Sequence, residues 1–139
     1  MMSEAWKSND LVYRQVHPSH APDGVPSSQA FNPTPKDEGR LSVDDSKLVT
    51  AEGSWNHFTK NLGFQSAGTW AVSFEEIEAP GGLVLLKAPV DDVENPSLNN
   101  PAHCLIDFNG LDSKGEKKRR AQQLAIKASA RGCQFQPPN

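Results

Sequence analysis

The segment between Ser113 and Gly132 constrains the fold most, because it has the features of one long helix with a defined start and end. Ser113 and Glu116 match a capping box, and Gly132 suits the position just past a helix end. Small and apolar residues recur between them at helical spacing, at Ala121, Leu124, Ala125 and Ala128. A stripe of such side chains can lie close to a sheet, so we predict a helix of about 18 residues packed on one.

Runs of β-forming residues predict the sheet that this helix would cover. They lie at 10–16, 40–43, 68–72, 83–87 and 102–108, with two briefer candidates at 28–31 and 133–135. The continuous apolar run at 83–87 is typical of a central strand. Two long stretches, 18–39 and 88–101, are rich in proline and polar turn residues, and we expect them to be loops.

Two short helices complete the predicted secondary structure. Thr50 can cap a helix over 51–61, and Ser73 with Glu76 forms a capping box for a helix over 74–79. The predicted fold class is α+β: a mostly antiparallel sheet of about four to six strands, one long C-terminal helix packed on it, and long proline-rich loops. We expect a flexible tail over residues 1–9 and a single domain over 10–136.

Positive charge is concentrated in the predicted C-terminal helix. Residues 112–139 carry seven Lys and Arg against two acidic residues, whereas the preceding 111 residues have a net charge of −8. The basic side chains that this helix would display are Lys117, Lys118, Arg119, Arg120 and Lys127. The simplest interpretation is a solvated outer face; contact with an acidic protein partner and, less favoured, with nucleic acid are the alternatives.

Hydropathy and cysteine usage narrow the class of protein. No apolar run approaches the ~18 residues that a membrane-spanning helix requires, and the first residues lack the basic-then-apolar pattern of a signal peptide. Cys104 and Cys133 lack metal-ligand spacing, so we expect free thiols. The sequence thus predicts a cytoplasmic protein without membrane association and without a cofactor.

Arg14, His17 and His20 lie at the end of the first predicted strand and form a candidate anion site. A guanidinium can bind phosphate or carboxylate through two hydrogen bonds, and a neighbouring imidazole can act as acid or base. The structural alternative is that Arg14 pairs with a carboxylate and the histidines are surface residues of a loop. His17-x-x-His20 is a weak metal motif because Pro18 prevents a helical pair, so no metal site is predicted.

Ser42 and His103 are the remaining candidates. His103 follows Asn100-Pro-Ala and enters a strand that we expect to be central, so we predict that it is partly buried. Such an imidazole either satisfies its hydrogen bonds on the backbone or is placed for catalysis. Ser42 lies on a short strand without a nucleophile elbow around it, so we do not expect it to act as a nucleophile.

Two resemblances add to these observations. The segments Tyr13-Arg14-x-x-His17-Pro18, Ser27-Ser28-x-Ala30-Phe31, Leu41-Ser42-Val43 and Asn100-Pro101-Ala102-His103 resemble a group of short, uncharacterised bacterial proteins. That resemblance implies a bacterial, soluble, stand-alone domain. Arginine on the first strand and serine on a later strand is also similar to ADP-ribosyltransferase-like folds, which implies that Arg14 and Ser42 would hold NAD. The acidic catalytic motif of that family has no clear equivalent here, because Glu75 and Glu76 fall in a predicted helix.

The function expected first is a small binding or regulatory module that acts through a protein partner, without catalysis. The alternative is a nucleotide- or phosphate-handling enzyme of ADP-ribosyltransferase-like or other type, with Arg14, His17, Ser42 and His103 as catalytic candidates and Arg14 and His20 as ligand-binding candidates. A further alternative is nucleic-acid binding through the basic helix 113–131. The enzyme hypothesis predicts that its candidate side chains converge in one cleft.

Overall fold

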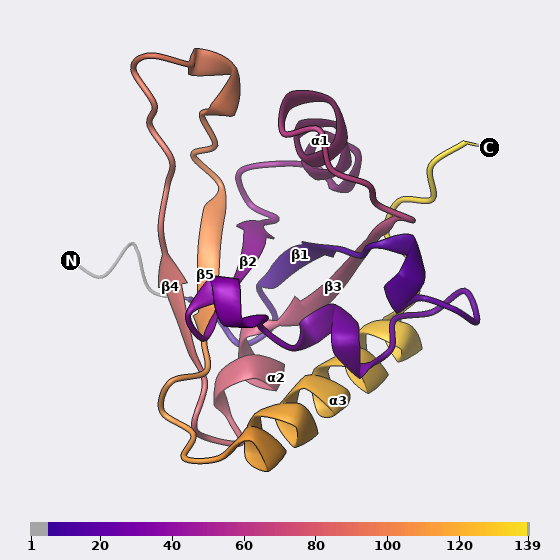
Figure 1. Cartoon of the computed structure of the whole chain (residues 1–139), viewed down its shortest axis with the longest axis vertical. Coiled ribbons are helices and arrows are strands. Elements are labelled where there is room, and N and C mark those ends of the chain that lie inside the picture. The colour runs from indigo at the N-terminus through magenta and orange to yellow at the C-terminus, as the bar shows by residue number, and fades with distance from the viewer. Residues whose placement is uncertain (1–5, 139) are drawn as a thin grey trace.

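The computed structural model describes residues 6–138, which form one antiparallel sheet with helices on both faces (Figure 1). The strands are β1 (Leu11–Gln15), β2 (Arg40–Asp45), β3 (Thr69–Ser73), β4 (Val84–Lys87) and β5 (His103–Asp107). Their order in the sheet is β3-β1-β2-β5-β4, and each neighbouring pair is antiparallel. The predicted α+β fold is therefore confirmed.

Helices occupy the connections and the C-terminal part of the chain. They are α1 (Ala51–Asn56), α2 (Phe74–Glu78) and α3 (Lys114–Arg131). α1 runs directly into a π-helical turn over His57–Asn61. Thr50, Ser73 and Ser113 cap the three α-helices as predicted, each accepting a hydrogen bond from the backbone N–H three residues further on. Across residues 6–138, none of the helices combines the length and the hydropathy needed to cross a membrane.

α3 packs on one face of the sheet through the small-residue stripe that its sequence predicts. The side chains of this stripe are buried, namely Ala121, Leu124, Ala125 and Ala128. They belong to one core cluster with Val12 of β1, Leu41 of β2 and Ile106 of β5. The helix lies obliquely across the lower part of the sheet in Figure 1, and the cluster makes the described residues a single packed unit.

α1 covers the opposite face of the sheet. Side chains alternate along a strand, so Gln15 points away from the face on which Val12 meets α3. The Gln15 amide Nε2 donates to Ser54 Oγ of α1 over 2.9 Å, and Thr69 Oγ1 donates to the Ala51 carbonyl over 3.1 Å. This second face is therefore polar where α1 meets β1 and β3.

The apolar run at 83–87 was expected to be a central strand, and that prediction is wrong. β4 lies at the edge of the sheet and pairs only with β5 among the described strands. Leu85 is buried in the core, whereas Val84 and Leu86 on the other face are 47% and 40% exposed. The run therefore reflects apolar residues on both faces of an edge strand. β2 takes the central position, between β1 and β5.

Two short segments that were predicted to be strands have other structures. Residues Ser28–Phe31 form a 3₁₀ turn that buries Ala30 and Phe31, and this turn packs against α3. Near the C-terminus, Phe135 makes a single antiparallel bridge to Thr69 and no strand. Both segments use their apolar side chains for packing, not for strand pairing.

Arg120 was expected among the exposed cations of α3, but it is buried, with 4% of its surface exposed. Its Nη2 donates to the Ile77 carbonyl over 3.1 Å, and its Nη1 donates to the Gly81 carbonyl. The reason is helical geometry, because position 120 lies one turn before Leu124 on the face that meets the protein. Burial and the adjacent Arg119 lower the pKa of Arg120.

The predicted tail over residues 1–9 falls partly outside the described residues, since the structure describes none of 1–5. Residues 6–9 are packed on the domain. The Trp6 ring stacks on Phe74 with a centroid distance of 6.2 Å, and the Glu75 N–H donates to the Ser8 carbonyl over 3.0 Å. Lys47 Nζ lies 4.1 Å from the Trp6 ring centroid. The packed region thus begins before β1.

Candidate functional site

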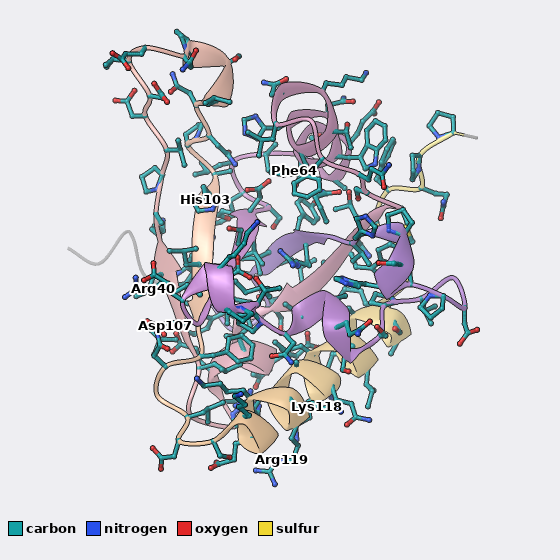
Figure 2. All side chains as sticks on the ribbon, viewed as in Figure 1. Arg40, Phe64, His103, Asp107, Lys118 and Arg119 are labelled. Carbon is teal, nitrogen blue, oxygen red and sulfur yellow. The ribbon has the colours of Figure 1, made fainter. Side chains whose placement is uncertain are left out.

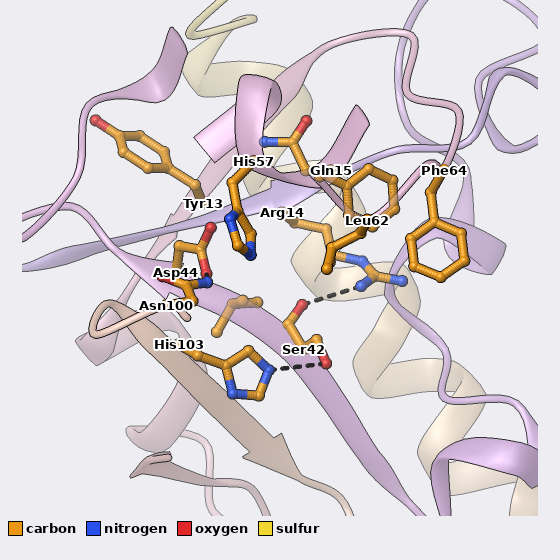
Figure 3. A pocket seen from close by; sticks show the side chains of 12 residues that line it. Tyr13, Arg14, Gln15, Ser42, Asp44, His57, Leu62, Phe64, Asn100 and His103 are labelled. Carbon is orange, nitrogen blue, oxygen red and sulfur yellow. Dashed lines mark hydrogen bonds between the residues drawn. The ribbon is translucent and has the colours of Figure 1, made fainter. Parts of the chain in front are cut away.

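A pocket opens where β1 and β2 separate. These strands share only two paired positions, Val12 with Asp45 and Tyr13 with Asp44, so their backbones part beyond Tyr13. The resulting cavity has a volume of about 140 Å³, and the π-helical turn and the chain that follows it line one side of it (Figure 3). We call it the Ser42 pocket, and its lining includes Arg14, Ser42, His57, Phe58, Phe64 and His103.

Arg14 crosses the gap between the separating strands. Its Nε donates to the Ala30 carbonyl over 2.8 Å, and its Nη1 donates to the Ser42 carbonyl over 2.9 Å. Within residues 6–138, no carboxylate forms a salt bridge with Arg14, and no hydrogen bond occupies its Nη2. Burial lowers the pKa of Arg14 to about 10, and nearby Asp37 opposes this only in part. The pocket therefore contains a desolvated cation with donors to spare.

Ser42 and His103 form a hydrogen-bonded pair at the pocket wall (Figure 3). His103 lies opposite Asp44 in the β2–β5 ladder and diagonal to Ser42, so the two side chains share a face. His103 Nδ1 lies 2.8 Å from the Ala88 carbonyl, which can only accept, and this places the proton on Nδ1. In the neutral ring Nε2 is then an acceptor, and the Ser42 hydroxyl donates to it over 3.1 Å. The hydroxyl thus has a base beside it.

A network of polar side chains forms part of the pocket wall, which includes Gln15, Asp44 and Asn100. Asp44 accepts from Ser54 Oγ over 2.7 Å and from Asn100 Nδ2 over 2.9 Å. Gln15 Nε2 donates to both Ser54 Oγ and Thr69 Oγ1 over 2.9 Å. The network links α1 to β1, β2, β3 and the chain before β5. Because buried polar groups are costly when unpaired, these satisfied contacts hold the pocket walls in one arrangement.

The rim of the pocket is aromatic. Phe58 belongs to the π-helical turn, and Phe64 follows it after the turn at Gly63, which has a φ of 78°. The two rings contact each other with centroids 5.1 Å apart. Phe64 is 57% exposed, and Figure 3 shows its ring beside the Arg14 guanidinium. An exposed aromatic ring beside a half-buried cation is a feature of ligand sites.

The structure brings together three of the four catalytic candidates. Arg14, Ser42 and His103 line the Ser42 pocket, whereas His17 does not. His17 is exposed and its Nδ1 bonds to Ser19, and the ring of His20 lies 5.8 Å away from that of His17. His20 also stays outside the pocket lining; burial, with His17 and Arg14 nearby, lowers its pKa. His57 also lines the pocket, and the sequence did not indicate it as a candidate.

The cations of α3 lie on the other side of the sheet from the pocket. The helix packs on the face of Val12, while the pocket residue Ser42 faces away from it. Lys118, Arg119 and Lys127 are exposed, Lys117 is partly buried and Arg120 is buried. Figure 2 shows Lys118 and Arg119 pointing outward from α3. These residues therefore form a surface separate from the pocket.

Metal-type ligands do not gather in the described part of the chain. Within residues 6–138, no group of three or more His, Cys, Asp or Glu side chains is placed to hold a metal ion. The two ring nitrogens of His103 are engaged with Ser42 and with the Ala88 carbonyl.

Comparisons with known proteins identify no relative: no protein-family model, no curated protein and no solved structure matches this chain. The description of the site therefore depends on its own geometry.

Part of the site has a signal in the sequence. Ser42 and Asp44 are polar residues that alternate with the apolar Leu41 and Val43 along β2. That pattern predicts a sheet face with polar side chains. Where a helix covers such a face, the polar side chains are candidates for a binding or catalytic site. His57 and Phe64 had no comparable signal, because the π-helical turn that orients them has no sequence motif.

Proposed function

We propose that this protein is an enzyme that binds a small phosphate-bearing molecule in the Ser42 pocket. The observation that carries the proposal is the placement of Arg14, a half-buried cation that forms no salt bridge within residues 6–138, beside the Ser42–His103 pair. Its hydrogen bonds go to neutral backbone carbonyls, so its charge is left to attract an anionic ligand in the pocket. This is the nucleotide- or phosphate-handling alternative, with Ser42 and His103 in place of the more remote His17.

Each residue has a defined part in this proposal. Arg14 donates from Nε and Nη1 to backbone carbonyls and keeps its Nη2 free to donate a charge-assisted hydrogen bond to a phosphate oxygen. His103 Nε2 accepts the Ser42 proton, or that of a substrate hydroxyl or water placed between them. The Ala88 carbonyl holds the imidazole in the required tautomer but lacks the full charge of a carboxylate, so it stabilises imidazolium less.

The test is binding of inorganic phosphate and pyrophosphate by isothermal titration calorimetry, with turnover of p-nitrophenyl phosphate as the activity assay. We expect Arg14→Met and Arg14→Lys to lose binding, the latter because lysine lacks the planar fork. Arg40→Met is the matched control, since Arg40 on the same sheet is exposed and pairs with Asp107 at 3.6 Å. Ser42→Ala and His103→Asn should keep binding and lose turnover. Equal binding by Arg14→Met, or none by the wild-type protein, refutes the proposal.

The exposed cations of α3 support a second candidate function, contact with an acidic protein partner. Lys118, Arg119 and Lys127 have no salt bridge within the described residues. The two free thiols support a reducing compartment, and we propose the cytoplasm. Cross-linking in lysate of the wild-type protein and of a Lys118→Glu, Arg119→Glu variant tests the contact, and an unchanged set of partners refutes it. Salt-sensitive binding to duplex DNA or RNA would instead favour nucleic acid.

A further inference from the structure

The cavity of the Ser42 pocket is smaller than most sites that enclose a whole organic ligand. Its volume of about 140 Å³ compares with roughly 300–1,000 Å³ for such sites, so a compact group such as phosphate is the part of a ligand that it suits. If Arg14 holds the phosphate, the remainder of the molecule must extend over the rim. The chemistry of the rim therefore selects the class of phosphate compound.

The rim presents a rigid aromatic surface. The Phe64 backbone N–H donates to the Phe58 carbonyl over 3.1 Å, and the Leu62 N–H donates to the His57 carbonyl over 3.0 Å. Phe58 is partly buried and supports the Phe64 ring at 5.1 Å. The Phe64 ring is therefore held in place while more than half of its surface stays open to a ligand.

We propose that the natural ligand is a nucleoside phosphate whose phosphate group contacts Arg14 and whose base stacks on Phe64. This inference rests on the proposed phosphate-binding function and extends it to a substrate class. Stacking on an exposed aromatic ring suits every nucleobase, because each has a flat π face. Leu62 and Phe64 are the two exposed apolar side chains among the described residues that line the pocket. Their combined apolar surface suits one flat ring and is too short for an acyl chain.

The experiment compares adenosine 5′-monophosphate with ribose 5-phosphate, which carries the same phosphate and sugar without the base. Calorimetric titration of the wild-type protein should give about 5- to 150-fold tighter binding of adenosine 5′-monophosphate, as expected for one stacked base. Phe64→Ala should remove this preference and leave the affinity for ribose 5-phosphate unchanged. Phe64→Tyr keeps a flat ring and should restore the preference. Val93→Ala, at an 86% exposed position outside the pocket, is the control.

The outcomes separate the two proposals. If both compounds bind the wild-type protein equally, or if the preference survives in Phe64→Ala, the base does not stack on Phe64 and this inference is overturned, while the phosphate site stands. If neither compound binds, both proposals fail. Both proposals are supported if Arg14→Met binds neither compound and Phe64→Ala loses only the preference for adenosine 5′-monophosphate.

Discussion

The burial of Arg120 makes a strong prediction about stability. Truncation in Arg120→Ala removes two charge-assisted hydrogen bonds, to the Ile77 and Gly81 carbonyls, which connect α3 to α2 and the turn before β4. Hydrogen bonds to charged groups contribute about 1.5–3 kcal/mol each. The cost of desolvating the guanidinium offsets part of this, and its buried Nε has no hydrogen-bond partner in the described structure. We expect a net loss of about 2–4 kcal/mol in the free energy of unfolding.

The adjacent Arg119 provides a matched control because it is exposed on the same turn of α3. Arg119→Ala should change the unfolding free energy by less than ~0.5 kcal/mol. Urea denaturation followed by circular dichroism measures the unfolding free energy of both variants. In a thermal scan, a loss of about 3 kcal/mol lowers the melting temperature by roughly 10 °C in a domain of this size. Arg120→Met retains the apolar stem and should fall between the two. The reasoning is refuted if Arg120→Ala and Arg119→Ala unfold within ~0.5 kcal/mol of each other.

Other perturbations test the core, an ion pair and the thiols. Leu124→Ala should cost about 2–5 kcal/mol in urea unfolding, because it opens a cavity under α3, and an unchanged midpoint would contradict the packing. Burial raises the pKa of Glu76, but its hydrogen bonds with Arg131 and with the Ser73 backbone outweigh this and hold the pKa below its usual value of 4.5. The stability that ionised Glu76 provides is therefore complete above pH 4.5 and is lost as the pH falls further. In unfolding curves recorded from pH 7 to pH 3, Glu76→Gln should be less stable than the wild-type protein at pH 7, and this difference in unfolding free energy should shrink below pH 4.5. A difference that stays constant with pH would exclude the ionic contribution. Burial raises the pKa of Cys104 to about 12, so a thiol reagent at pH 8 should label exposed Cys133 alone until the protein unfolds, and two rapid labels would show that Cys104 is accessible.

Elements with local signals were predictable from the sequence. α3 begins and ends where Ser113 and Gly132 indicate, and Leu124 lies on its buried face. The capping box of Ser73 and Glu76 correctly predicted α2. In these cases the determining contacts span three or four residues, so the sequence pattern contains the necessary information.

Features that depend on distant pairing were not predictable. The position of β4 at the edge follows from which strands pair, and its apolar residues are compatible with either an edge or a centre. Arg14, Ser42 and His103 were identified as candidates one by one, but the 3.1 Å contact of Ser42 with His103 joins residues 61 positions apart. The spacing of Arg120 from Leu124 places it on the buried face of α3, but the backbone carbonyls that make burial of its charge possible are distant and have no sequence signature.

The order of strands in the sheet also affects how the chain folds while it is being synthesised. β2, at the centre of the sheet, pairs on one side with β1 and on the other with β5, which is the last of the five strands in chain order. Such long-range pairing slows folding, because loop closure must precede the contacts that reward it. During synthesis the β5 side of β2 therefore stays unpaired until residues 103–107 have been made, and in that interval the exposed strand edge is open to contact with chaperones.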